Sequence, residues 1–125
     1  MTISEVSKKC NVSADTLRYY EKAGLISFIN RTPGGVRNYT EQDCKQIEFI
    51  KCMRSAGLSI EVLRKYFELL KRGKRTLKTR RDLLANERES LRALFKELQD
   101  TLKRLDYKIS VYDKALKSKD KELKF

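Results

Sequence analysis

The sequence predicts a mainly α-helical protein, in which a compact unit of short helices and one hairpin is followed by a single long helix. Capped amphipathic segments and stopping glycines follow one another up to Gly73. After Gly73 neither glycine nor proline occurs, and leucines recur every seven residues. We therefore expect the compact unit at residues 1–73, the long helix at 74–117 and a charged tail at 118–125.

The compact unit begins with two short helices joined by a tight turn. Thr2 and Glu5 have the spacing of a capping box at the start of the first helix. Ser13 is placed to cap the second helix, expected over residues 14–23, and Gly24 to end it. Two short helices in this arrangement predict a helix-turn-helix.

A hairpin is expected next, between Ile26 and Tyr39, around the turn Thr32-Pro33-Gly34-Gly35. Proline followed by glycine is typical of a type II turn. The third and fourth helices come after the hairpin, with expected bounds of 40–57 and 59–73. A hairpin beside a helix-turn-helix predicts a winged form of that motif.

The long helix carries a narrow apolar stripe. Two apolar series with a period of seven are offset by four residues, which is the spacing of a coiled-coil seam. The stripe runs along a helix of about 60 Å, and the small N-terminal unit of the same chain cannot cover that length. We therefore expect a coiled coil with a second copy; the alternative is a helix folded back onto the compact unit. The expected dimer contacts are Leu91, Phe95, Leu98, Leu102, Leu105, Ile109, Tyr112 and Leu116.

The charge of the chain favours a polyanionic partner. Its 125 residues include 29 lysines and arginines against 17 acidic residues, a net charge of +12. Such an excess favours nucleic acid or an anionic membrane surface. No stretch approaches the roughly 20 apolar residues of a membrane span, and the start lacks the apolar stretch of a secretory signal. We therefore expect a cytoplasmic protein with no membrane partner.

The residues typical of metal centres and of catalysis are scarce. The chain has three cysteines, unclustered, and no histidine, which argues against a disulfide framework and against a structural zinc site. Neither a glycine-rich phosphate loop nor paired carboxylates in an apolar setting occur. We therefore expect no metal, no cofactor and no enzymatic activity.

The second helix of a helix-turn-helix presents its N-terminal part to the major groove of DNA. In this chain that surface offers Ser13, Thr16, Arg18 and Tyr19. An arginine can bond guanine or phosphate through two donors, and a tyrosine can donate to phosphate. These four residues are therefore the expected DNA contacts of the helix-turn-helix.

Two further sets of residues are candidates for contacts with the DNA backbone. Arg31, Arg37 and Tyr39 surround the glycine-rich tip of the hairpin, although an ordinary solvated turn would have the same composition. Arg54 and Ser59 lie where the third helix ends and the fourth begins, and a helix N-terminus is suited to phosphate. Both sets would flank the groove that the recognition helix enters.

Four segments together resemble the MerR family of winged-helix transcription regulators. They are LRYYEKAGLI (17–26), GVRNYT (35–40), IEFIK (47–51) and AGLSI (56–60). The resemblance covers the whole chain, since that family adds a long antiparallel coiled-coil helix after its DNA-binding domain. Ser27 and Val36 depart from the family pattern, where proline and an aromatic residue are common.

The resemblance implies a homodimer on a pseudo-palindromic promoter site, which distorts the DNA and so switches transcription by RNA polymerase. It also assigns roles to residues of this chain. Those residues are Arg18 and Tyr19 in the recognition helix, Arg37 and Tyr39 in the first wing, and Arg54 and Ser59 in the second wing.

The positions of the cysteines suggest the class of effector. Metal-sensing members use cysteines near the end of the long helix, and this chain has none after Cys52. The segment around Cys52 resembles the short subgroup that senses aldehydes and nitrosative stress (NmlR/AdhR-like), in which a cysteine there is the proposed sensor. Lys51 and Arg54 flank Cys52 and would favour its thiolate, whereas burial would make it an inert core residue. Cys10, at a helix end, and Cys44, expected on a polar face, offer no comparable argument.

Two other classes of protein compete with a sequence-specific regulator. A basic coiled-coil protein that binds the nucleoid or RNA without sequence selectivity would carry the same charge. A structural coiled-coil adaptor would not need the capped N-terminal unit. The expected helix-turn-helix and wing argue against both.

Overall fold

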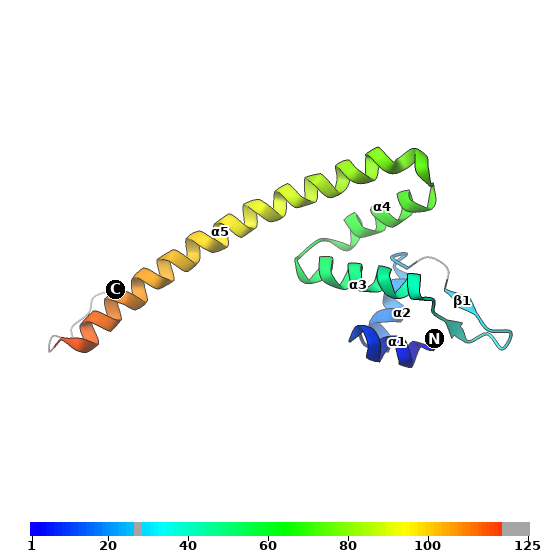
Figure 1. The fold of residues 1–125 in the computed structure, drawn as a ribbon, viewed down its shortest axis with the longest axis horizontal. Coiled ribbons are helices and arrows are strands. Elements are labelled where there is room, and N and C mark those ends of the chain that lie inside the picture. Colours follow the sequence, from blue (N-terminus) through cyan, green and yellow to red (C-terminus); the bar gives the residue numbers. More distant parts are fainter. Residues whose placement is uncertain (27–28, 119–125) are drawn as a thin grey trace. The chain divides into compact units, whose positions relative to one another are not determined.

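The computed structural model describes residues 1–26 and 29–118 (Figure 1). Its elements are α1 (Ile3–Cys10), α2 (Ala14–Lys22), β1 (Asn30–Arg31), β2 (Arg37–Asn38), α3 (Glu41–Ser55), α4 (Ile60–Lys71), the 3₁₀ turn η1 (Lys74–Thr76) and α5 (Leu77–Lys117). The predicted mainly α-helical class is confirmed, with a winged helix-turn-helix before a long C-terminal helix. The chain divides into two compact units, Met1–Ala85 and Asn86–Phe125. Ser27, and all of the predicted tail except Ser118, lie outside the described residues.

Side-chain caps start the first four α-helices at the residues that the sequence indicated. The hydroxyl of Thr2 accepts a hydrogen bond from the backbone N–H of Glu5 at 3.2 Å, and the Glu5 carboxylate accepts one from the N–H of Thr2. Thr40 and Asp43 form the same reciprocal pair at the start of α3. The caps of α2 and α4 are Ser13 and Ser59. Each cap pairs backbone donors that the first turn of a helix otherwise leaves unsatisfied.

The tip of the hairpin corrects the predicted turn type. The backbone N–H of Gly35 donates to the carbonyl of Thr32 at 2.8 Å, which closes a turn over the expected four residues. The positive φ, +83°, belongs to Gly35, whereas a type II turn would require it at Gly34. The geometry is that of a type I turn followed by a left-handed residue, a common three-residue hairpin loop.

One hydrophobic core holds the first unit together. Helices α1 to α4 and both ends of the hairpin contribute apolar side chains to it. The largest fully buried side chains are Leu17, Leu25, Ile26, Ile47, Ile50, Leu63, Val6 and Cys10. Cys44, which we expected on a polar face, is also buried in this core, so that expectation was wrong. Its position in α3 is one turn before Ile47, on the face that packs inward.

Cationic side chains from later helices bind the C-terminal ends of earlier ones. The ammonium group of Lys51, in α3, donates to the carbonyl of Cys10 at the end of α1, at 2.9 Å. The guanidinium of Arg64, in α4, donates in the same way to the carbonyl of Ala23 at the end of α2, also at 2.9 Å. A positive charge at this end of a helix interacts favourably with the helix dipole and pairs a free carbonyl. These bonds tie the helix-turn-helix to the helices that come after it.

The junction between α4 and α5 is closed by a buried threonine. The hydroxyl of Thr76 donates toward the carbonyls of Leu69 and Gly73, at 2.7 and 2.8 Å. The same hydroxyl oxygen accepts a hydrogen bond from Nε of Arg80 at 3.0 Å. A carbonyl in the last turn of α4 is therefore bound by the last residue of η1, and Arg80 in the first turn of α5 holds that residue in place.

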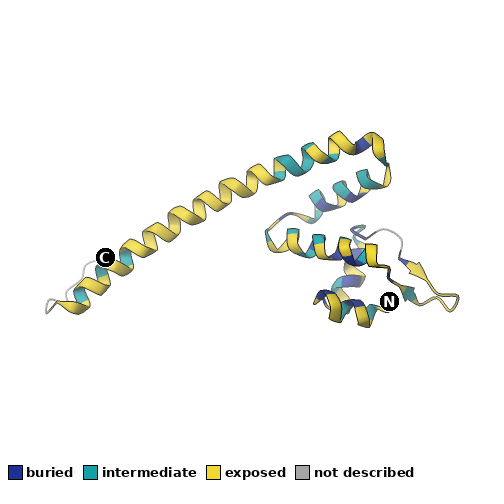
Figure 2. Ribbon diagram, viewed as in Figure 1, coloured by how far each residue is buried: buried dark blue, intermediate teal, exposed yellow. Residues whose placement is uncertain are grey.

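Helix α5 runs for 41 residues and has no buried residue (Figure 2). The eight side chains of the predicted seam, from Leu91 to Leu116, are between 39% and 72% exposed. Such a continuous apolar stripe on one helix is typical of a surface that a partner covers. No helix in residues 1–26 and 29–118 is long and apolar enough to span a membrane.

The core predicts the effect of removing a small buried side chain. Val6 has no exposed surface, whereas Val36, at the hairpin tip, is 57% exposed. We expect Val6→Ala to lower the free energy of unfolding by about 2 kcal/mol, through lost burial and a residual cavity. The matched change Val36→Ala should leave it within about 0.5 kcal/mol of the parent value. Urea unfolding followed by circular dichroism measures both; equal effects of the two substitutions would contradict the assigned core.

Candidate DNA interface

Helix α2 has two distinct faces, and only one of them is free. Leu17 and Tyr20 are buried in the core, while Arg18 and Tyr19, between them in sequence, are exposed. The successive positions of a helix point in directions about a quarter of a turn apart, so burial of one pair orients the other outward. The structure thus brings the two predicted recognition-helix residues to the surface of the helix-turn-helix.

The start of α2 is held by a compact hydroxyl network. The hydroxyl of Ser13 accepts from the backbone N–H of Thr16 at 3.1 Å and donates to the hydroxyl of Thr16 at 2.7 Å. Ser13 therefore caps the helix, and the hydroxyl of Thr16 accepts a hydrogen bond from this cap. Both hydroxyl groups lie beside the exposed N-terminus of α2, where the N–H groups of the first turn favour binding of a phosphate.

Arg18 is paired within its own helix. Its Nη1 lies 2.9 Å from a carboxylate oxygen of Asp15, three residues earlier, and both side chains are largely exposed. Exposed pairs of this kind contribute little to stability because water and salt compete for both charges. The guanidinium of Arg18 can therefore exchange Asp15 for a base or a phosphate at small energetic cost.

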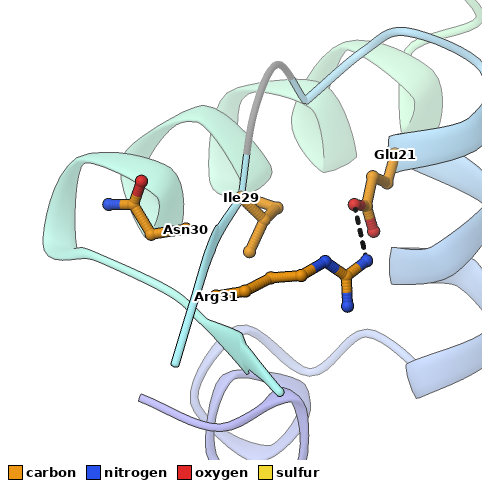
Figure 3. A pocket seen from close by; sticks show the side chains of 4 residues that line it. All are labelled: Glu21, Ile29, Asn30 and Arg31. Atoms are coloured by element: carbon orange, nitrogen blue, oxygen red, sulfur yellow. Dashed lines mark ion pairs between the residues drawn. The ribbon is translucent and has the colours of Figure 1, made fainter. Parts of the chain in front are cut away.

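Both hairpin arginines point back to the recognition helix. Nε of Arg37 donates to a carboxylate oxygen of Glu21 at 2.7 Å, and Nη2 of Arg31 lies 3.6 Å from the other oxygen. Donation of this hydrogen bond to Glu21 raises the pKa of the Arg37 guanidinium above its usual value. A pocket of about 520 Å³ opens here, lined by Glu21, Ile29, Asn30 and Arg31 (Figure 3). The wing therefore meets α2 through one carboxylate shared by two arginines.

Tyr39 lies in the core rather than on the wing surface. Only 2% of the residue is exposed, and its hydroxyl is enclosed without a hydrogen-bond partner among the described residues. Burial raises the pKa of this phenol. In this structure the residue supports the wing from beneath, and its predicted contact with DNA would require the ring to move.

The turn between α3 and α4 contains the residues of the predicted second wing. The guanidinium of Arg54 donates to the carbonyl of Leu58 at 2.7 Å, which spans the turn. Ser59 caps the N-terminus of α4 through the N–H of Val62. The two residues lie at the same turn, with exposed positions at both of them.

The three cysteines lie in different environments. Cys52, near the end of α3, is exposed, whereas Cys10 and Cys44 are buried. Burial is the main cause that raises the pKa of the Cys10 thiol to about 11. The interpretation of Cys52 as a core residue is therefore excluded. Its cationic neighbours in sequence, Lys51 and Arg54, each donate to a backbone carbonyl.

Sequence reasoning missed two residues that organise this surface. Glu21 holds both wing arginines, and Arg64 binds the C-terminal end of α2. An acidic residue on the recognition helix of so basic a chain was a usable signal for Glu21, because an unpaired carboxylate there would repel DNA. No local pattern points to Arg64, which lies 41 residues from its partner in the sequence.

Comparison with known proteins gives two family matches. The model described as "MerR HTH family regulatory protein" matches residues 1–70, and the model "MerR, DNA binding" matches residues 44–107. The HTH-type transcriptional regulator AdhR of Bacillus subtilis is 52% identical over 91 residues. That match covers 73% of this chain, and the chain spans only 65% of the length of AdhR.

Solved structures agree with these matches. A protein described as a MerR-family transcriptional regulator from Listeria monocytogenes is 46% identical, with a TM-score of 0.90 over 93% of this chain and 88% of its own. HiNmlR, described as a MerR-family regulator lacking the sensor domain and bound to promoter DNA, is 30% identical, with a TM-score of 0.83. That match covers 91% of this chain and 90% of HiNmlR. The resemblance to the MerR family and its NmlR/AdhR-like members is thereby confirmed.

The exposed face of α2 predicts a base or phosphate contact by Arg18. We expect Arg18→Ala to weaken binding to a selected operator by about 1–3 kcal/mol and to relax selectivity, if the guanidinium reads a base. Loss of a phosphate contact would instead weaken operator and random DNA equally and lower the salt slope by about one. Fluorescence anisotropy titrations on both DNAs at several salt concentrations separate these results.

A matched control comes from α5. Arg92 forms an exposed ion pair with Glu89, three residues earlier, at the same 2.9 Å as the pair of Arg18. Arg92→Ala removes the same charge from the same kind of pair and should leave operator affinity nearly unchanged. An operator affinity of Arg18→Ala equal to that of Arg92→Ala would refute the proposed face.

Proposed function

This chain belongs to the MerR family of helix-turn-helix regulatory proteins, and from that premise we propose that it regulates transcription as a homodimer on promoter DNA. The observation that carries the proposal is the free face of α2, with Arg18 and Tyr19 exposed beside a wing. The family and the relatives are transcriptional regulators, in agreement with the prediction that the chain is not an enzyme.

The proposed docking follows the geometry of a winged helix-turn-helix. The N-terminal part of α2, with Ser13, Thr16, Arg18 and Tyr19, would enter the major groove. The hairpin and the turn between α3 and α4 would contact phosphates on either side, through the residues Arg31, Arg37, Arg54 and Ser59. Residues 1–73 would thus form the DNA-binding part and residues 74–117 the dimerising part.

The experiment that tests this function is selection of DNA from a random pool by the purified protein. Recovery of a pseudo-palindromic sequence with two similar halves would support the proposal, because a two-fold dimer reads two half-sites. Recovery of no preferred sequence would favour the alternative of a basic protein that binds nucleic acid without selectivity.

We propose that the second copy covers the exposed stripe of α5. The spacings from Leu91 to Leu116 alternate between four and three residues and are the same read from either end. Two antiparallel helices related by an axis midway between Leu102 and Leu105 would therefore pair every member of the stripe with another member. Leu91 would lie opposite the partner's Leu116, and Leu102 opposite the partner's Leu105.

The dimer is further proposed to distort the promoter DNA that it spans, and so to alter its use by RNA polymerase. The support is family membership and the short reach of each DNA-binding unit, which needs a second unit to hold both half-sites. Enhanced nuclease or chemical cleavage midway between the half-sites would reveal such a distortion. A uniform cleavage pattern across a bound operator would contradict it.

We propose Cys52 as the residue that couples the regulator to aldehydes or other electrophiles. It is exposed, whereas both other cysteines are buried and the thiol of Cys10 has a pKa of about 11. Electrophiles react with exposed thiolates and leave buried thiols inert. Cys52 also lies two residues before Arg54, which holds the turn leading into α4. An adduct there would lie beside the second wing.

Charged substitutions in the stripe should prevent dimerisation. We expect the double variant Leu98→Asp and Leu102→Asp to sediment as a monomer and to lose operator binding, because the two half-sites are then read separately. The control variant, Lys96→Asp with Lys103→Asp, also introduces two aspartates, but at exposed positions of α5 outside the stripe. Analytical ultracentrifugation distinguishes the two; a dimeric Leu98/Leu102 variant would reject the interface.

Substitution of the exposed cysteine should uncouple sensing from DNA binding. We expect Cys52→Ser to abolish induction of a promoter reporter by formaldehyde while operator affinity stays at the parent value. The matched variants Cys10→Ser and Cys44→Ser should keep induction if they fold. Mass spectrometry after brief alkylation of the native protein should show label on Cys52 alone. Normal induction in Cys52→Ser would place the sensing site elsewhere.

A further inference from the structure

We propose that Glu21 is a positioning residue that holds the wing in its DNA-binding place, and that the two wing arginines have different tasks. Arg37 fixes the hairpin to the recognition helix, whereas Arg31 is the one that exchanges Glu21 for a DNA phosphate. The proposal rests on the docking of α2 and the hairpin proposed above. It changes the role of Arg37 from a direct contact to a support.

The geometry joins one carboxylate to both strands of the wing. Glu21 lies in the last turn of α2, and its side chain is three-quarters buried. In the hairpin register Arg31 lies directly opposite Arg37, one on each strand. Each arginine reaches a different oxygen of the Glu21 carboxylate. A single side chain on the recognition helix therefore holds β1 and β2 together.

The wing needs such an anchor because its own sheet is minimal. Each strand has two residues, and every residue from Asn30 to Val36 is exposed. A two-stranded hairpin of this size is not stable by itself in water. Its position is therefore set by the buried residues at its base, Ile29 and Tyr39, by the hydrogen bonds of Met1 to Asn38 and Tyr39, and by the ion pairs of Glu21. The ion pairs of Glu21 are the part of this support that comes from α2.

The two ion pairs differ in strength. The contact of Arg37 is a charge-assisted hydrogen bond of 2.7 Å, and its side chain is 27% exposed. The contact of Arg31 is 3.6 Å, beyond ordinary hydrogen-bond length, and its side chain is 46% exposed. Arg31 also donates to the carbonyl of Gly35 at 3.1 Å, which directs it along the hairpin. A phosphate oxygen would therefore displace Glu21 from Arg31 more readily than from Arg37.

The competing role for Glu21 is simple neutralisation of nearby positive charge. It predicts the opposite change in operator affinity when the carboxylate is removed. A carboxylate near DNA repels phosphate, so its removal should raise affinity unless the side chain holds something that DNA needs. We expect Glu21→Gln to bind the selected operator about fivefold more weakly than the parent. Asp15→Asn, the same chemical change at an exposed position of the same helix, should bind at least as tightly.

Variants of the two arginines distinguish support of the wing, proposed for Arg37, from contact with a DNA phosphate, proposed for Arg31. Arg37→Gln should weaken binding by no more than Glu21→Gln does, since Glu21→Gln also removes the longer pair with Arg31. The double variant Glu21→Gln/Arg37→Gln should bind no more weakly than Glu21→Gln alone, because the single change at Glu21 already removes the bond to Arg37. Arg31→Gln should lower the salt slope by about 0.9 for each subunit, while Arg37→Gln keeps the parent slope. Equal slopes for the two arginine variants, or additive losses in the double variant, would overturn the division of tasks.

A measurement on the free protein separates this inference from the docking itself. Amide hydrogen exchange across the hairpin should quicken about fivefold in Glu21→Gln and remain unchanged in Asp15→Asn, with the thermal transition of both near that of the parent. If Glu21 positions the wing but α2 does not bind DNA as proposed, hairpin exchange will still quicken in Glu21→Gln, whereas Arg18→Ala will bind the operator as tightly as the parent. Unchanged exchange in the hairpin, or tighter operator binding by Glu21→Gln, would refute the positioning role.

Discussion

The C-terminal ends of the first two helices depend on cationic side chains that come from much later in the chain. Lys51 binds the last carbonyl of α1, and Arg64 binds the carbonyl just beyond the end of α2. The helix-turn-helix is only two short helices, too short to be stable alone. These bonds, together with the core beneath Leu17, fix α2 so that its outer face stays free.

This use of positive charge changes how the net charge of +12 should be interpreted. An excess of lysine and arginine suggests a polyanion, but several of these side chains serve the fold instead. Arg80 supports the buried Thr76 between α4 and α5, and Arg37 is committed to Glu21. Within α2 and the wing, the arginines best placed for DNA are therefore Arg18 and Arg31, whose own side chains are about half exposed. Charge alone does not distinguish the two groups; the exposure of each arginine side chain does.

Local patterns predicted the helices well because their determinants are local. Caps act over three residues, and the stripe of α5 repeats along one helix, so both are visible in the sequence. The turn type was predicted wrongly because Pro33-Gly34 suits more than one turn, and the positive φ falls on Gly35. The burial of Cys44 and Tyr39 was not predicted, since neighbouring charges gave Cys44 a polar setting and the wing motif gave Tyr39 a surface role. Long-range partners such as Arg64 and Ala23 have no local signature at all.

The proposed sensor and the proposed second wing share one short turn of chain. The N–H of Ala56 bonds to the carbonyl of Cys52 as α3 ends, and the guanidinium of Arg54 bonds to the carbonyl of Leu58 across the next turn. The thiol of Cys52 is exposed, so an adduct could form without opening the core. A larger or charged group there would act first on this turn, whose geometry sets the start of α4 at Ser59. Arg64, in α4, also donates a hydrogen bond to the end of α2, so a shift of α4 would change the position of the recognition helix. An adduct on Cys52 would then change DNA binding by displacing α4, which Arg64 joins to the end of α2. All of these contacts lie within the compact unit Met1–Ala85.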